Sequence, residues 1–277
     1  MGTLHLVATP IGNLEDISPR AVRILRESRL IAAEDTRVTR KLLAHFDIHT
    51  PLTSYFEHNK LSKLETILAA LNKGSVALVS DAGTPAINDP GYELVCAALE
   101  AGHTVSPVPG PTAPVAALVA SGLPTSSFLY LGYLPRKSSE RLAMVSQIAS
   151  LPHTLVFLET PHRLLSALKD LETALGDRQI SIARELTKVH EEIWRGSISA
   201  GAEYFTQNEP RGEFTLVIAG QRTDEKSRWT EDKVKIALKI GLKLGESPAV
   251  LAGRVAQESG WNRREVYKLA VELKGLV

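Results

Sequence analysis

The chain of 277 residues has one cysteine, few aromatic residues and no long apolar run. The single cysteine, Cys96, excludes an internal disulfide and fits a reducing compartment. It lies in an amphipathic helical pattern, so we expect it in the core. No run approaches the ~20 apolar residues of a membrane span, and the amino terminus lacks the basic and apolar regions of a signal peptide. We therefore expect a cytoplasmic protein with no membrane partner.

Several common catalytic and binding motifs are also missing. There is no G-x-x-x-x-G-K-[ST] or G-x-G-x-x-G loop to cradle phosphates, and no G-x-S-x-G nucleophile elbow. The sequence has no H-E-x-x-H motif and no cysteine pair, and its eight histidines show no zinc spacing, so we expect no metal site. The loops that are present are small and rich in accessible backbone. They would suit a ligand with an adenine ring, an amino-acid end and no phosphate.

What the chain does have is a regular alternation of short apolar runs and amphipathic helical patterns. This predicts an α/β fold with a mostly parallel sheet covered by helices. The central strand is predicted at residues 76–79, and ligands of such sheets bind just beyond the carboxyl ends of the strands. There Gly83 would let the backbone approach a ligand closely. Asp89 and Pro90 are interpreted as the cap and first residue of the next helix.

Three parts are predicted along the chain. Residues 121–135 are rich in Gly, Pro and Ser and place a boundary between α/β domains at 1–120 and 121–220. Residues 221–277 form a tail with a polar linker at 221–230 and three helical patterns, the last two resembling a helix-turn-helix pair. The tail has twelve Lys/Arg against eight Asp/Glu, a net charge of +4, which leaves −3 for the body. Either a nucleic-acid-binding tail or a solvated helical face explains this asymmetry.

Seven motifs stand in the order seen in one family: ATPIGNL (8–14), AEDTR (33–37), SDAGTP (80–85), PGP (109–111), ETPHR (159–163), ARELTK (183–188) and RGEF (211–214). From Gly2 to about Gly220 the chain resembles the ribosomal RNA small subunit methyltransferase I family, a branch of the tetrapyrrole (precorrin-like) methylases. The tail also resembles the extension of that family. The resemblance implies two α/β domains of tetrapyrrole-methylase type with a small C-terminal helical extension. It further implies a homodimer that uses S-adenosylmethionine to methylate the 2′-oxygen of a cytidine ribose in the decoding centre of 16S rRNA, free or in the small ribosomal subunit.

The same resemblance implies which residues bind the cofactor. They come from loops of both domains: Pro10, Ser80, Asp81, Ala82, Gly83, Thr84, Pro85, Ile87, Pro109, Gly110, Pro111, Thr112, Glu159, Ala183, Arg184 and Gly212. In one respect the chain departs from the pattern. Many tetrapyrrole methylases carry Gly-Asp-Pro where this chain has Gly-Thr-Pro, so the role of that aspartate does not transfer to Thr84.

The chemistry requires an oxygen of a weakly acidic ribose hydroxyl to attack a methyl carbon in line. Positioning can supply much of the rate, and a base would add ~10²–10⁴-fold. The candidate bases are Glu34, Asp35, Glu159 and Lys188, and Lys188 qualifies if burial beside Arg184 lowers its pKa. Arg37 is a candidate for holding a phosphate. We predict Glu34, Arg37 and Lys188 as the catalytic set, although local ion pairs would explain the same charges.

Two other functions fit parts of the sequence. A small-molecule tetrapyrrole methylase would share the fold, but a soluble macrocycle gives no reason for a basic tail. A non-catalytic nucleic-acid binder could use the helical patterns at residues 245–274. The two-domain α/β body, with its converging loops, is far larger than such a binder needs.

Overall fold

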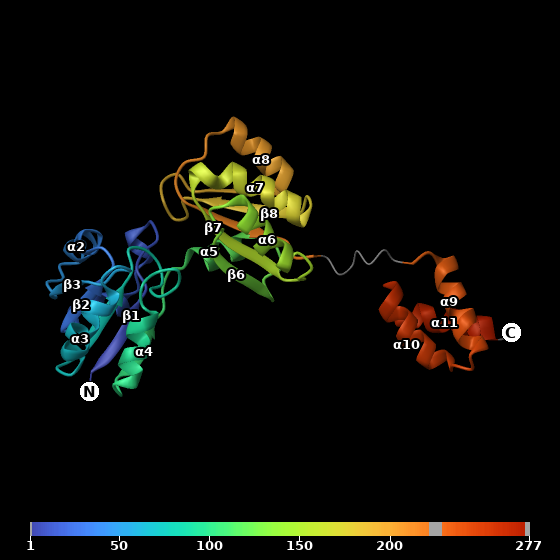
Figure 1. The fold of residues 1–277 in the computed structure, drawn as a ribbon, viewed down its shortest axis with the longest axis horizontal. Coiled ribbons are helices and arrows are strands. Elements are labelled where there is room, and N and C mark those ends of the chain that lie inside the picture. The colour runs from blue at the N-terminus through green and yellow to red at the C-terminus, as the bar shows by residue number, and fades with distance from the viewer. Residues whose placement is uncertain (1, 222–228, 275–277) are drawn as a thin grey trace. The chain divides into compact units, whose positions relative to one another are not determined.

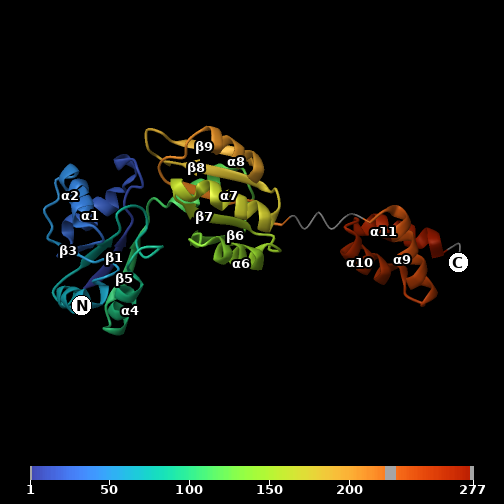
Figure 2. The same ribbon diagram turned by 45° about the horizontal axis from the view of Figure 1, so that its top comes forward.

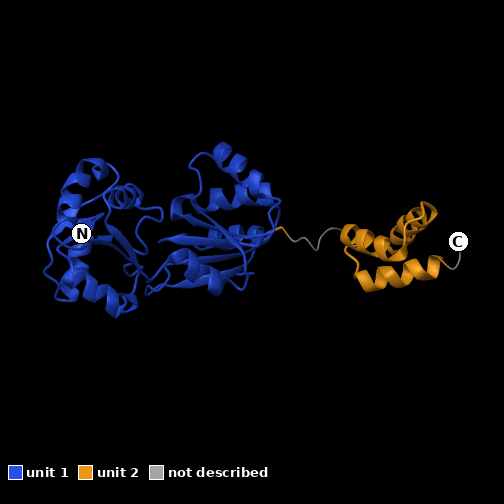
Figure 3. Cartoon of the chain, turned by 90° about the horizontal axis from the view of Figure 1, so that it is seen from below, with its two compact units in different colours: residues 1–220 blue, residues 221–277 orange. Residues whose placement is uncertain are grey.

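The structure, a computed structural model, describes residues 2–221 and 229–274. The chain divides into two compact units, Met1–Gly220 and Gln221–Val277, which Figure 3 colours separately. Most of the polar linker predicted at 221–230 lies outside the described residues. Each unit has its own hydrophobic core, and they are described in turn.

The first half of the larger unit contains a five-stranded sheet in the order β3-β2-β4-β1-β5. All of its strand pairs are parallel, as predicted. The strands are β1 (Thr3–Val7), β2 (Leu30–Ala33), β3 (Leu52–Ser54), β4 (Val76–Val79) and β5 (Thr104–Val108). β4 is the middle strand, which confirms the prediction from its apolar run.

Burial on both faces explains why β4 is a continuous apolar run. Ala77 and Val79 pack with helices α1 (Pro19–Glu27) and α2 (Thr36–His45) on one face. Val76 and Leu78 pack with α3 (Lys60–Leu71) and α4 (Tyr92–Glu100) on the other. A strand covered on both faces needs apolar residues at every position rather than at alternate ones. The polar residues that follow it are therefore held at the edge of a rigid layer. Figures 1 and 2 show helices beside the strands of this half.

The second half contains a sheet in the order β6-β7-β10-β8-β9. Its strands are β6 (Phe128–Tyr133), β7 (Thr154–Glu159), β8 (Gln179–Arg184), β9 (Glu192–Ser197) and β10 (Phe214–Ile218). Only β6 and β7 are parallel neighbours in this sheet; the other three pairs are antiparallel. The expectation of a mostly parallel sheet is therefore wrong for this half. β10 inserts between β7 and β8 in the opposite direction, and β8 and β9 follow each other along the chain.

Helices cover both faces of this second sheet. α6 (Ser138–Ile148), α7 (Pro161–Leu175) and α8 (Ile198–Gln207) pack on one face. α5 (Ala113–Ser121) packs on the other, where Ala117 and Leu118 contact the strands, and Figure 1 shows it beside this sheet. β6 lies inside the Gly-, Pro- and Ser-rich stretch predicted as a boundary, so the sequence analysis missed that strand. The domain division at residue 120 stays a prediction.

Several local predictions are confirmed and others are wrong. Ser18 before Pro19 predicts a helix start and Gly176 predicts a helix end; the structure confirms both, since the Ser18 side chain caps α1 and α7 ends at Gly176. Asp89 is not a helix cap, because α4 begins after Gly91. The spacing of Leu61, Leu64, Leu68 and Leu71 predicts one buried stripe on α3, but Leu61 is 69% exposed, whereas Ile67 is buried. Cys96, expected in the core, is only partly buried.

The described part of the smaller unit contains the three helices that were predicted: α9 (Glu231–Lys243), α10 (Pro248–Ser259) and α11 (Arg263–Lys274). Buried aliphatic residues from all three helices form its core. The Trp261 indole donates a hydrogen bond to the Trp229 carbonyl oxygen (2.7 Å) and so ties the start of α9 to the α10–α11 turn. The helix-turn-helix character of the last pair stays a prediction. Within the described residues, no helix is both long and apolar enough to cross a bilayer.

Candidate active site

The loops that follow β1 and β4 are tied together at the carboxyl edge of the first sheet. Thr9 and Gly83 exchange two backbone hydrogen bonds of 2.9 and 3.0 Å. The Thr9 hydroxyl also donates to the Ser80 carbonyl oxygen at 3.2 Å. Gly83 has φ +82°, a conformation that favours glycine, so the loop can turn here without strain. Parallel strands bring these loops to one edge, which is where a ligand site was expected.

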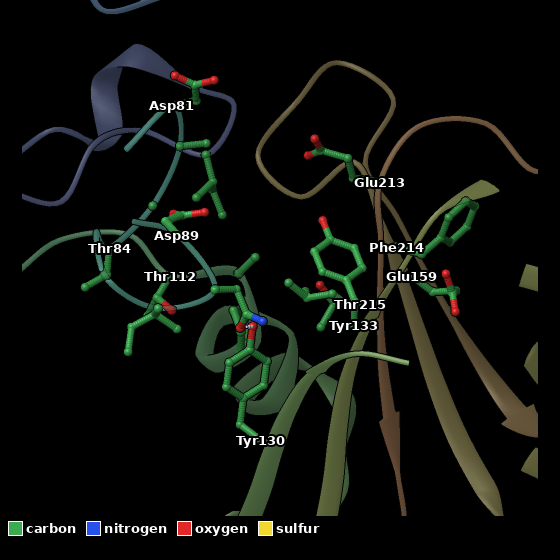
Figure 4. A pocket seen from close by; sticks show the side chains of 18 of the residues that line it. Asp81, Thr84, Asp89, Thr112, Tyr130, Tyr133, Glu159, Glu213, Phe214 and Thr215 are labelled. Carbon is green, nitrogen blue, oxygen red and sulfur yellow. Dashed lines mark hydrogen bonds between the residues drawn. The ribbon is translucent and has the colours of Figure 1, made fainter. Parts of the chain in front are cut away.

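A cavity of about 250 Å³ lies beside these loops. The first half contributes the loop residues Asp81, Thr84 and Asp89, among others. The second half contributes Tyr130 and Tyr133 of β6 and residues of β7 and β10, as Figure 4 shows. The cavity is therefore built by both halves of the larger unit.

A second contact between the halves lies next to the cavity. The Asn13 amide donates to the Thr187 hydroxyl at 3.0 Å. A Cβ added to Gly12 would lie 2.5 Å from the Lys188 Cγ, so the two loops can approach this closely only because residue 12 is glycine. The loops after β1 and β8 thus hold each other at one side of the site.

The cavity wall is acidic. Glu34, Asp81, Asp89, Glu159 and Glu213 all line it, and no Lys, Arg or His does so among the described residues. Burial and, after it, the neighbouring charge of Glu34 raise the pKa of Asp89 to about 6, against a hydrogen bond from Ser80. Burial also raises the pKa values of Glu34 and Asp81. A site of this charge attracts cations and repels phosphate.

Two of the cavity carboxylates hold each other's loops in place. The Asp81 amide donates to Glu34 Oε2 at 3.2 Å, and the Asp35 amide donates to Asp81 Oδ1 at 2.9 Å. These reciprocal bonds connect the loop after β2 to the loop after β4. Glu159, which is 1% exposed, accepts a hydrogen bond from the Thr160 amide (2.8 Å) and pairs with Arg163 (3.2 Å). Its buried charge is therefore compensated.

The predicted catalytic residues have three different positions. Glu34 lines the cavity. Arg37 is 84% exposed at its side chain and pairs with Asp35 at 2.6 Å. Lys188 pairs with Glu185 (2.8 Å) and Glu213 (3.2 Å). Burial alone would lower the pKa of Lys188, but its hydrogen bonds with the two glutamates outweigh burial and raise that pKa. The lowered pKa on which its role as a base depended is not found, so that part of the prediction is wrong.

The predicted cofactor-binding residues divide into three groups. Seven line the cavity: Asp81, Ala82, Gly83, Thr84, Ile87, Thr112 and Glu159. Pro10, Ser80, Pro85 and Pro109–Pro111 do not line it, although Thr84 Oγ1 donates to the Pro111 carbonyl oxygen at 3.3 Å. The remaining three belong to other hollows: Ala183 to a small adjoining one, and Arg184 and Gly212 to a depression near His190 and Arg211.

Sequence reasoning missed several cavity residues. Asp89 was assigned to a helix cap, and Tyr130 and Tyr133 belong to the strand that was not predicted. Glu213 stands in the RGEF motif, but no role was given to it. The signal that could have found Asp89 is its place only four residues after the SDAGTP motif, directly after Asn88.

Comparison with known proteins places the chain in a family. The family of Tetrapyrrole (Corrin/Porphyrin) Methylases matches residues 3–201. A Synechocystis sp. protein named ribosomal RNA small subunit methyltransferase I is 47% identical over 276 residues, covering 99% of this chain and 99% of that protein. The protein of the same name from Escherichia coli O157:H7 is 44% identical over 280 residues, with 99% and 96% covered.

Solved structures agree on the fold. Uroporphyrin III C-methyltransferase from Thermus thermophilus is 22% identical, with a TM-score of 0.56 over 79% of this chain and 98% of that one. The cobalt precorrin-4 methyltransferase CbiF is 16% identical, with a TM-score of 0.60 over 78% and 94%. At such identities the likeness concerns the fold alone. The full-length relatives are far more similar, and with them the chain belongs to the ribosomal RNA small subunit methyltransferase I family, within the tetrapyrrole methylases.

Proposed function

We propose that this protein transfers a methyl group from S-adenosylmethionine to the 2′-oxygen of a cytidine ribose in 16S rRNA. The observation that carries the proposal is an acidic cavity at the carboxyl edge of the first sheet, in a chain 47% identical to a ribosomal RNA methyltransferase. The rival function, methylation of a tetrapyrrole, is suggested by the description of the family model and by structures of 16–22% identity, whereas the relatives of 41–47% identity are named as ribosomal RNA methyltransferases.

The cavity fits the cofactor by its charge. S-adenosylmethionine, when bound, supplies a methyl carbon on a positively charged sulfur, and it carries an ammonium group as well. Asp81 offers a carboxylate to these cationic groups, while Gly83 leaves room for the ligand near the backbone. Tyr133 offers an aromatic surface on the opposite side. The acidic wall disfavours phosphate, in agreement with a cofactor that has none.

The predicted cofactor-binding residues that do not line the cavity have different roles in the proposal. Pro10, Ser80, Pro85 and Pro109–Pro111 act indirectly, by fixing the loops whose neighbours line the cavity. Ala183, Arg184 and Gly212 would contribute only if the second half moved toward the ligand. Binding of S-adenosylmethionine by two variants tests which residues contact the cofactor. Its affinity should be unchanged in Arg184→Gln and weaker in Thr84→Val.

Arg37 and Lys188 are proposed to hold RNA phosphates at the rim. Lys188 pairs directly with Glu213 of the cavity wall, and Arg37 is connected to Asp81 of the wall through Asp35. Phosphate contacts position the nucleic acid, while the reacting ribose enters the cavity. Arg37→Ala and Lys188→Met should weaken RNA binding and flatten its salt dependence, with cofactor affinity unchanged.

The proposed partners are 16S rRNA or the small ribosomal subunit, in the cytoplasm, and a second copy of the chain. Exposed apolar side chains on α4 and α5 support self-association: Tyr92, Leu99 and Val119 are 72%, 57% and 69% exposed. Light scattering during gel filtration should give twice the chain mass of 30.1 kDa. A monomer at micromolar concentration would remove the homodimer from the proposal.

The enzymatic proposal is tested with purified protein, methyl-labelled S-adenosylmethionine and small ribosomal subunits from cells that lack the protein. Label should appear in 16S rRNA at one cytidine and should resist alkaline hydrolysis, because a 2′-O-methyl group blocks attack by the 2′-oxygen on the adjacent phosphate. Transfer to a base, or no transfer to RNA, would contradict it.

A further inference from the structure

Asp89 lies in the cavity wall although its sequence context suggested a helix cap. Figure 4 shows its carboxyl group extending from the loop of the first half toward the side of Tyr133. The segment that presents it is strained, since Ala86 (φ +68°) and Asn88 (φ +63°) are both in the left-handed region. Non-glycine residues keep such conformations only where the surrounding structure holds them, and they cluster at functional sites.

The surrounding structure that holds this segment is β6 of the second half. The Tyr130 hydroxyl donates a hydrogen bond of 2.7 Å to Asn88 Oδ1. Opposite the same amide stands Gly132, where an added Cβ would lie 2.2 Å from Asn88 Nδ2. The Asn88 side chain is therefore held against β6, in a space that exists because residue 132 has no side chain. This contact of Asn88 with Tyr130 and Gly132 is called the Asn88 latch. The latch fixes the residue before Asp89 and so fixes where the Asp89 carboxyl group points.

The other cavity carboxylates are engaged by backbone amides or cations. Glu34 accepts from the Asp81 amide, and Asp81 accepts from the Asp35 amide. Glu159 is bound by an amide and by Arg163, and Glu213 pairs with Lys188. Asp89 differs from them, because within the described residues its hydrogen-bond donor is the Ser80 hydroxyl and no cation pairs with it.

We infer that Asp89 is the general base of this enzyme, the group that removes the proton of the ribose 2′-hydroxyl; the inference rests on the function proposed above. The 2′-oxygen forms a bond to the methyl carbon as the carbon–sulfur bond breaks, and the electron pair of that bond stays on sulfur as a neutral thioether. The hydroxyl proton passes to the Asp89 carboxylate and from there to solvent. No further reactant is needed.

The charge environment suits this role. Burial raises the pKa of Asp89 to about 6, so it is ionised at neutral pH and is more basic than an ordinary aspartate. The titratable groups that face it come from five elements or loops: Glu34 after β2, Asp81 after β4, Tyr130 and Tyr133 of β6, Glu159 of β7 and Glu213 before β10. Burial raises the pKa of Tyr130 to about 12, so Tyr130 stays neutral and donates to Asn88 throughout the working range.

Glu34 has a different part in this arrangement. Its negative charge raises the pKa of Asp89, while its own carboxylate is bound to the Asp81 amide. Glu34 therefore makes Asp89 a stronger base without accepting the proton itself. This distinguishes the present assignment from the sequence-based prediction that Glu34 is a candidate base.

The experiment measures single-turnover methylation of small ribosomal subunits from cells lacking the protein, between pH 5 and 9, with S-adenosylmethionine and enzyme in excess. The variants are Asp89→Asn, Glu34→Gln and the matched control Asp47→Asn, an aspartate whose side chain is 89% exposed. Asp89→Asn should lower the rate ~10²–10⁴-fold and remove the fall in rate below pH ~6. Glu34→Gln should move that fall to lower pH, and Asp47→Asn should match the wild type.

A second measurement needs neither cofactor nor RNA. A raised pKa means that the ionised Asp89 carboxylate disfavours the folded state, an effect absent below the unfolded pKa near 4 and complete above pH ~6. The melting temperature of Asp89→Asn relative to wild type should therefore rise between pH 4 and 7. The same difference for Asp47→Asn should stay flat.

Three results would overturn the inference. One is a wild-type rate and pH profile in Asp89→Asn. Another is a loss of S-adenosylmethionine affinity in that variant large enough to explain its rate, which would make Asp89 a cofactor ligand. The third is a melting difference that does not change with pH. Failure of the proposed function itself looks different, because the wild-type protein would then transfer no methyl group to the subunits at any pH.

Discussion

Replacing Gly83 with valine should abolish binding of S-adenosylmethionine and leave the Met1–Gly220 unit folded. Gly83 has φ +82°, and an L-residue in the left-handed region costs about 1–2 kcal/mol. Domains are stable by roughly 5–15 kcal/mol, so the unit tolerates that cost. For a unit of this size the melting temperature should fall by about 2–4 °C for each kcal/mol.

The effect on the ligand comes from where the new side chain lies. A Cβ on Gly83 would be 3.4 Å from Ile11 Cγ2 and 3.8 Å from the Pro111 carbonyl oxygen, which are ordinary contact distances. The Cβ therefore fits, but the two γ-methyl groups of valine need more room beside Ile11, and Ile11 lines the cavity. The methyl groups should occupy space that the cofactor needs.

Gly122 supplies a matched control. It has φ +81°, and no atom of the described chain lies within 4 Å of its added Cβ. Gly122→Val carries a similar backbone cost at a site outside the cavity wall. Isothermal titration with S-adenosylmethionine should show normal affinity in Gly122→Val and none in Gly83→Val, with both melting temperatures slightly lowered. Normal affinity in a folded Gly83→Val protein would refute the placement of the cofactor.

Three further outcomes follow from the structure. Truncation after Gly220 removes a separate compact unit, so cofactor affinity should persist while RNA binding weakens and becomes less dependent on salt. If filter binding shows the same salt dependence of RNA affinity before and after truncation, the tail is only structural. Arg141→Ala breaks a buried pair with Asp170 (2.7 Å) and should lower the free energy of unfolding in urea by about 3–5 kcal/mol. Arg23→Ala breaks the exposed pair with Glu27 and should lower it by less than ~1 kcal/mol. Equal losses in the two variants would contradict this. Tyr130→Phe releases the Asn88 latch and should slow methyl transfer without moving its pH dependence; a shifted pH profile would mean that the tyrosine titrates in the reaction.

Much of the fold could be predicted because inner strands such as β4 and β10 are buried at every position and read as continuous apolar runs. The sequence predicts strands at residues 30–33, 52–54, 76–79 and 214–218, and β2, β3, β4 and β10 have these bounds. β6 was missed because its residues are largely half-exposed and its neighbours are rich in turn-forming residues. Strand direction in the second sheet could not be predicted, since it depends on how distant segments pair rather than on local pattern.

The site was predictable where motifs mark it and not where tertiary structure overrides local signals. The loop at residues 81–84 lines the cavity as expected. Asp89 precedes a proline and a helix, which is a normal position for a helix cap. Asp89 lies in the cavity wall instead, next to Asn88, which the Tyr130 hydroxyl holds by a hydrogen bond. Lys188 was expected to lose basicity by burial, but Glu185 and Glu213, distant in sequence from each other, have the opposite effect.

The central claim is that this chain methylates a ribose of 16S rRNA. The most direct test is to map 2′-O-methylation along 16S rRNA from cells with and without the gene for this protein, and from cells in which Asp89→Asn replaces the wild type. The account predicts one cytidine in the decoding centre that is ribose-methylated with the wild-type protein and unmethylated, or nearly so, in the other two. An identical methylation map in cells with and without the protein would contradict it.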